Sequence, residues 1–140
     1  MLRGMATVSF FADDLPAAQR WYTELLGTEP YFIRPHPPAA PGYVEFRLGD
    51  HQHELGIIDR TYAPGTPADR PGGAVVFWHV DDLPATLERL QAMGAREYES
   101  LIEREAGFRT ASVVDPFGNI LGVMYNPHYL EMLNGQFGAG

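Results

Sequence analysis

Asp13-Asp14-Leu15-Pro16-Ala17 recurs 68 residues later as Asp81-Asp82-Leu83-Pro84-Ala85, in a chain of 140 residues. An apolar run precedes each copy, and apolar residues at helical spacing follow it until Gly27 or Gly94. Proline is tolerated in the first turn of a helix, and an aspartate there can accept free backbone N–H groups. Each copy therefore predicts the start of a helix, and its aspartates are interpreted as structural caps.

Three extended segments follow each predicted helix and complete a second level of the repeat. Leu55-Gly56-Ile57 matches Leu121-Gly122-Val123, 66 residues later. Each half thus predicts strand, helix, strand, strand, strand, which is an α+β fold of two βαβββ modules. The predicted strands are Ala6 to Ala12, Tyr31 to Arg34, Tyr43 to Leu48, Gln52 to Ile58, Ala74 to Val80, Arg96 to Ser100, Arg109 to Val114 and Asn119 to Tyr125.

Composition limits the possible classes of function. Hydrophobic residues make up 45% of the chain and charged residues 20%, as in a globular domain. The net charge of −8 argues against nucleic acid as a partner, because like charges repel. The sequence has no cysteine, so disulfides and thiolate sites are excluded. No apolar run long enough to span a membrane and no targeting segment is recognised, and we expect a cytoplasmic protein.

The repeat, together with the turn Asp115-Pro116-Phe117-Gly118-Asn119, resembles the vicinal oxygen chelate superfamily. That group includes glyoxalase I, bleomycin-resistance proteins and extradiol dioxygenases. The resemblance covers about residues 5 to 126. It implies that the two modules pair to form a curved sheet around a cavity, within a single glyoxalase-like domain spanning 1–140. The expected parts are module one at 5–58, a linker at 59–73, module two at 74–126 and a C-terminal extension at 127–140.

The same resemblance implies four metal-ligand positions, on the first and last strands of each module. Three of them hold Thr7, Val75 and Gly122, none of which is a usual ligand. The fourth is either Gly56 or Glu54. A divalent ion needs several oxygen or nitrogen donors, so we expect no metal and no other cofactor. His51 and His53 are interpreted as a solvated or packed pair rather than as a metal site.

Strand alternation indicates which side chains line the expected cavity. In module two, the residues assigned to the cavity face include Arg109, Ala111 and Val113 together with Ile120, Gly122 and Met124. His79 is either a packed residue or a ligand contact, and we expect it to share the cavity with Glu54. The three charged residues of module one either bind a ligand or merely pair across strands. The predicted ligand-binding residues are Phe11, Glu45, Arg47, Glu54, Phe77, His79 and Arg109.

Apolar walls with a few converging polar groups are typical of a small-molecule site. The sequence therefore favours a protein that binds a small organic, aromatic or amphipathic ligand without a metal. The alternative is a metal-dependent enzyme of the same superfamily, a glyoxalase-type lyase or isomerase or an extradiol dioxygenase. A pure interaction domain is the weakest interpretation, since it leaves the inward polar residues unexplained. Family members commonly dimerise, and the apolar segment Pro127 to Leu133 needs a surface to cover, so we expect a homodimer.

Overall fold

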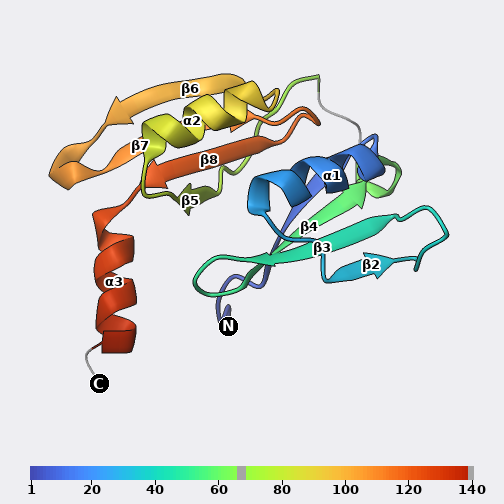
Figure 1. Cartoon of the computed structure of the whole chain (residues 1–140), viewed down its shortest axis with the longest axis horizontal. Helices are drawn as coiled ribbons and strands as arrows, with labels where there is room; N and C mark the ends of the chain where they lie inside the picture. The colour runs from blue at the N-terminus through green and yellow to red at the C-terminus, as the bar shows by residue number, and fades with distance from the viewer. Residues whose placement is uncertain (66–68, 139–140) are drawn as a thin grey trace. The chain divides into compact units, whose positions relative to one another are not determined.

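The computed structural model describes residues 1–65 and 69–138 (Figure 1). The chain divides into two compact units, Met1–Asp69 and Arg70–Gly140, which are called unit 1 and unit 2 below. Each unit holds one four-stranded mixed sheet. Part of the predicted linker, residues 66–68, lies outside the described residues.

Unit 1 has the predicted βαβββ order. Its sheet runs β1-β4-β3-β2, with β1 parallel to β4 and the other neighbours antiparallel. A short 3₁₀ turn, η1, follows the last strand. The elements are β1 (Thr7–Ala12), α1 (Leu15–Leu26), β2 (Phe32–Arg34), β3 (Tyr43–Leu48), β4 (His53–Asp59) and η1 (Arg60–Tyr62).

Unit 2 repeats this topology, which confirms the predicted fold class. Its sheet runs β5-β8-β7-β6, again with the outer parallel pair formed by the first and last strands. A C-terminal helix, α3, follows the last strand. The elements are β5 (Phe77–His79), α2 (Leu83–Ala92), β6 (Arg96–Glu103), η2 (Glu105–Gly107), β7 (Arg109–Val114), β8 (Ile120–Tyr125) and α3 (Pro127–Gly138). No helix of the described residues is long and apolar enough to cross a membrane.

The repeated motif starts both helices in the way the sequence predicts. Asp14 Oδ1 accepts a hydrogen bond from the Ala17 N–H at 3.1 Å, and Asp82 Oδ1 accepts one from the Ala85 N–H at 3.0 Å. The second aspartate of each pair is thus the cap. The first aspartate of each pair also has a structural contact. Asp13 Oδ1 forms an ion pair with Arg60 Nε at 3.0 Å, and Asp81 Oδ1 lies within hydrogen-bond distance of His79 Nε2, at 3.1 Å.

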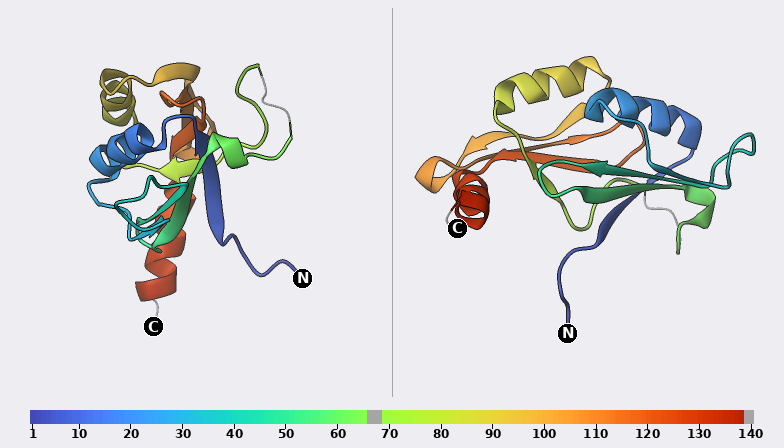
Figure 2. Two further views of the ribbon diagram at one scale, coloured as in Figure 1. Left: turned by 90° about the vertical axis from the view of Figure 1, so that its right-hand side faces the viewer. Right: turned by 60° about the horizontal axis from the view of Figure 1, so that its bottom comes forward.

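The two faces of the unit 1 sheet differ in character. One face is apolar and buried beneath α1, which covers it in Figure 2. The opposite face carries polar and aromatic side chains and is called the open face below. Alternation predicted this division, and the register confirms it. The buried face consists of Phe10, Ala12, Val44, Phe46, Leu55 and Ile57.

The alternation predicted for β7 is wrong by one residue. Ser112 pairs with Gly122 and Thr110 with Met124, so these four residues share one face of the sheet. Arg109 pairs with Tyr125 and therefore lies on the other face. A one-residue slip reverses every side chain because the period of a strand is two. Hydrophobicity gives no guide in β7, since its residues from 111 to 114 are buried on both faces.

Strand β6 forms an edge of the unit 2 sheet and has an irregular pairing. Its register to β7 shifts between Glu97 and Glu99 and again between Glu99 and Ile102. Almost all of its side chains are exposed. The strand extends to Glu103, three residues beyond the predicted end. These shifts are β-bulges or similar irregularities, which bend a strand and leave residues unpaired.

Candidate functional site

The open face of unit 1 gathers polar side chains from three strands. Register places Thr7, Glu54 and Arg47 in one row across β1, β4 and β3. The next row holds Ser9, Gly56, Glu45 and Phe32, and a third includes Phe11 and Tyr43. We call the interacting polar set of this face the open-face cluster. It consists of Thr7, Tyr31, Tyr43, Glu45, Arg47 and Glu54.

Tyr43 lies flat on this face because the residue beneath it has no side chain. A Cβ atom added to Gly56 would stand 2.5 Å from the Tyr43 hydroxyl oxygen and 2.8 Å from its ring. The hydroxyl donates a hydrogen bond to Glu45 Oε1. Burial raises the pKa of the Tyr43 phenol, a hydrogen bond with Thr7 lowers this pKa, and the charge of Glu54 raises it again. Tyr43 is therefore held as a neutral hydrogen-bond donor.

The two carboxyl groups of the cluster occupy different environments. Glu54 Oε1 lies 3.5 Å from Arg47 Nη2 and accepts a hydrogen bond from the Tyr31 hydroxyl, also at 3.5 Å. The Arg47 guanidinium lies 4.2 Å from the centre of the Tyr31 ring. Burial raises the pKa of Glu45, the negative charge of Glu54 raises it further, and Arg47 lowers it. The net effect is that the pKa of Glu45 lies above its ordinary value.

Removing the negative charge of Glu54 should lower the raised pKa of Glu45. In Glu54→Gln, we expect the pKa of Glu45 to fall towards its ordinary value, because the repulsion disappears and Arg47 loses its competing partner. An NMR titration that follows the Glu45 side-chain carboxyl carbon measures this pKa. Glu29→Gln is a matched control, because the charge of Glu29 is not among the causes of the shift. An unchanged or higher Glu45 pKa in Glu54→Gln would contradict this description of the site.

The register shows which of the two candidates, Gly56 or Glu54, corresponds to Gly122 in the repeat. Gly56 pairs with Ser9, and Gly122 pairs with Phe77, the residue that corresponds to Ser9 in the repeat. Gly56 is therefore the counterpart of Gly122, while Glu54 pairs with Thr7.

Neither glycine supplies a ligating side chain, and the space beside each is occupied by other groups. The Tyr43 ring covers Gly56, and a Cβ at Gly122 would stand 2.6 Å from the Val76 carbonyl oxygen. No group of three or more His, Asp or Glu side chains suited to a metal occurs among residues 1–65 and 69–138. The residues at these positions do not fit the divalent ion that the superfamily resemblance implies.

His79 is fixed by contacts within unit 2. Its Nδ1 accepts a hydrogen bond from the Asn126 N–H at 3.1 Å, and its Nε2 lies 3.1 Å from Asp81 Oδ1. The ring stacks on Tyr129 of α3, with centroids 4.9 Å apart. Only 8% of the side chain is exposed. The interpretation of His79 as a packed residue is therefore favoured over that of a ligand contact, since both ring nitrogens have partners.

The structure brings some predicted site residues together and separates others. Glu45, Arg47 and Glu54 form one cluster, and Phe11 lies on the same face. Arg109 pairs instead with Glu103 at 3.3 Å, on the face opposite Gly122. Phe77 is 41% exposed beside Gly122. That Glu54 and His79 share a cavity stays a prediction, because they belong to different units.

Two aromatic residues of the cluster were not among the predicted ligand-binding residues. Tyr43 alternates with Val44 along β3 and so lies on the open face, and the signal that gives it a role is Gly56, the residue without a side chain that it covers. Tyr31 begins the strand predicted at Tyr31 to Arg34, but β2 starts only at Phe32, so the alternation of the strand does not extend to Tyr31.

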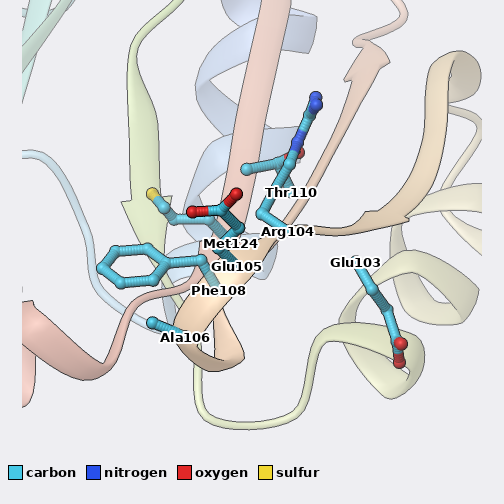
Figure 3. Close-up of a pocket in the computed structure, with 7 residues that line it drawn as sticks. All are labelled: Glu103, Arg104, Glu105, Ala106, Phe108, Thr110 and Met124. Carbon is cyan, nitrogen blue, oxygen red and sulfur yellow. The ribbon is translucent and has the colours of Figure 1, made fainter.

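An open pocket of about 790 Å³ lies within unit 2, where β6 turns into β7 (Figure 3). The turn contains Ala106, a non-glycine residue in the left-handed region with φ of 56°. Gly107 marks a turn in the sequence, but it does not show that Ala106 before it is also left-handed, and the pocket was therefore not predicted. The lining residues are Glu103, Arg104, Glu105, Ala106, Phe108, Thr110 and Met124.

Comparison with known proteins identifies the family. The model of the Glyoxalase/Bleomycin resistance protein/Dioxygenase superfamily matches residues 4–123, so this chain belongs to that superfamily. A search of curated proteins found no match.

Solved structures show the same fold. A glyoxalase/bleomycin resistance protein from Catenulispora acidiphila is 25% identical, with a TM-score of 0.59, covering 89% of this chain and 100% of its own. A glyoxalase-related enzyme from Fulvimarina pelagi is 22% identical, with a TM-score of 0.68 and 90% of each chain covered. A lactoylglutathione lyase from Agrobacterium tumefaciens is 21% identical, with a TM-score of 0.64, covering 89% of this chain and 95% of its own.

Proposed function

We propose that this protein binds a small organic ligand on the open face of the unit 1 sheet, and that it does so without a metal ion. The observation that carries the proposal is the hydrogen-bonded pair of Tyr43 and Glu45, set beside the ion pair of Arg47 and Glu54. Converging polar groups among aromatic side chains suit a ligand with an apolar body and an oxygen function.

Each part of the cluster has a role in this proposal. The Tyr43 hydroxyl can turn from Glu45 to donate to a ligand oxygen, and Glu45 can then accept from a ligand hydroxyl or, when protonated, donate to a carbonyl. The aromatic side chains of Phe11, Tyr31 and Phe32 cover the apolar part. The alternative, a metal-dependent lyase, isomerase or dioxygenase, would need donor side chains at positions such as Gly56 and Gly122, which have none and are covered by Tyr43 and Phe77.

The binding test uses phenols, aromatic alcohols and aromatic ketones as probes, with amide NMR spectra of the whole chain as the readout. We expect the amide signals of β3 and β4 to shift when a probe binds. Tyr43→Phe should weaken binding by about 3- to 10-fold, because the variant loses one hydrogen bond to the probe. Tyr98→Phe is the matched control, because Tyr98 is an exposed tyrosine on β6. Prior treatment with a chelator should leave the affinity unchanged.

Three outcomes would overturn the proposal. They are shifts that avoid β3 and β4, equal affinity in Tyr43→Phe and the unaltered chain, and loss of binding after chelation that added metal restores. The last result would favour the metal-dependent enzyme.

Two further expectations belong to this proposal. We place the protein in the cytoplasm and expect it to form a homodimer with the partly exposed apolar residues Leu130 and Leu133 of α3 as part of its surface. Light scattering at micromolar concentration measures the mass, and a monomer would contradict the dimer.

A further inference from the structure

The pocket of unit 2 is built from residues that the proposed function does not use. Thr110 and Met124 are cross-strand partners, so both project from the same face of the sheet. The turn after β6 supplies the remaining wall. Figure 3 shows Glu105, Phe108 and Met124 projecting into the same pocket.

The backbone of the turn fixes these side chains. Ala106 and Gly107 follow one another in the left-handed region, with φ of 56° and 83°. The Phe108 N–H donates to the Glu105 carbonyl at 3.1 Å, and the Arg104 N–H donates to the Phe108 carbonyl at 2.7 Å. These two bonds close the turn, so Glu105 and Phe108 lie on the two sides of a short hydrogen-bonded loop.

The charges of the pocket are not equally available to a ligand. Glu103 pairs with Arg109 at 3.3 Å, and the Nε of Arg104 donates to the Thr110 hydroxyl at 3.2 Å. Within the described part of the chain, Glu105 has no ion-pair partner. In Figure 3 the Arg104 guanidinium extends away from Phe108, whereas the Glu105 carboxylate lies towards Met124.

We propose that this pocket binds a small organic cation, an amine attached to an apolar or aromatic body. The Glu105 carboxylate would pair with the ammonium group, and the face of the Phe108 ring would attract the same charge. The apolar body would contact Met124 and the Ala106 methyl group, since a thioether adapts to irregular apolar shapes. The net charge of −8 further favours a cation over an anion.

A matched series of probes tests the charge requirement. The probes are 3-phenylpropylamine, 3-phenylpropan-1-ol and 3-phenylpropanoate, which share a body and differ in the end group. We expect the amine to bind about 3- to 10-fold more tightly than the alcohol, as one exposed ion pair and one cation–π contact allow. The carboxylate should bind more weakly than either. The advantage of the amine should shrink in high salt, because exposed charges are screened.

Side-chain NMR signals locate the site and variants identify its charge. The Met124 methyl signal and the Phe108 amide should shift with the amine. Glu105→Gln should remove most of the advantage of the amine over the alcohol, leaving only the cation–π contact with Phe108, and should not change the affinity for the alcohol. Glu99→Gln is the matched control, because it removes the same charge from an exposed position on β6 outside the pocket lining.

The inference fails if the alcohol binds as tightly as the amine, if Glu99→Gln has the same effect as Glu105→Gln, or if the amine shifts residues outside the pocket only. Shifts confined to β3 and β4 would support the proposed function while overturning this inference. Shifts confined to η2, β7 and Met124 would support this inference alone.

Discussion

Substituting alanine for Gly122 should lower the free energy of unfolding by about 2–4 kcal/mol. The new methyl group would stand 2.6 Å from the Val76 carbonyl oxygen, 2.9 Å from Phe77 Cδ1 and 3.0 Å from Val75 Cγ1. The carbonyl cannot simply move, because it accepts the Gly122 N–H at 3.1 Å. The parallel pairing of β5 with β8 must therefore open. Urea unfolding followed by circular dichroism measures the loss.

Gly56→Ala is the matched control for this substitution, because Gly56 occupies the corresponding position of the repeat. Its methyl group would meet only the far end of the Tyr43 side chain, which can rotate away. We expect a loss of stability below about 1 kcal/mol, accompanied by loss of the Tyr43–Glu45 hydrogen bond. Equal costs at the two glycines would contradict this account of the two modules.

Truncating His79 to alanine should destabilise the protein by about 2–4 kcal/mol, since two hydrogen bonds, one aromatic stack and a mostly buried ring are lost. The Asn126 N–H would lose its acceptor, and β5 would lose its connection to the start of α3. Thermal or urea unfolding of the whole chain measures the effect.

Two substitutions separate the parts of this effect. His128→Ala should change stability by less than about 0.5 kcal/mol, because that side chain is 65% exposed and lies 3.9 Å from Glu131. His79→Asn should recover part of the loss, because an amide oxygen can replace Nδ1 as the acceptor. If His79→Ala left stability unchanged, the structural role of this ring would be refuted.

The fold and the open face of unit 1 could be predicted because their signals are local. The helix starts are marked by the Asp-Leu-Pro motif, and Val44 and Phe46 alternate cleanly with Glu45 and Arg47 along β3. A strand with one apolar and one polar face has a register that the sequence itself specifies. The grouping of Glu45, Arg47 and Glu54 follows from that alternation.

The remaining features depend on contacts that no local pattern shows. Strand β7 is buried on both faces, so alternation gave no sign that Arg109 belongs to the face opposite Gly122. The orientation of His79 depends on Asn126, 47 residues further along the chain, and on Tyr129 in the segment beyond the repeat. The pocket depends on the left-handed backbone of Ala106. Sequence patterns do not predict this conformation at an alanine, because residues other than glycine rarely adopt it.

The irregular edge strand β6 has a consequence for solubility. The free edge of a sheet is a template on which another chain can add a strand, and such addition leads to aggregation. In β6 the breaks in register after Glu97 and Glu99 interrupt the regular ladder that an incoming strand would need. A second copy of β6 would also bring like carboxylates together. These features of the strand oppose edge-to-edge association of unit 2 through β6.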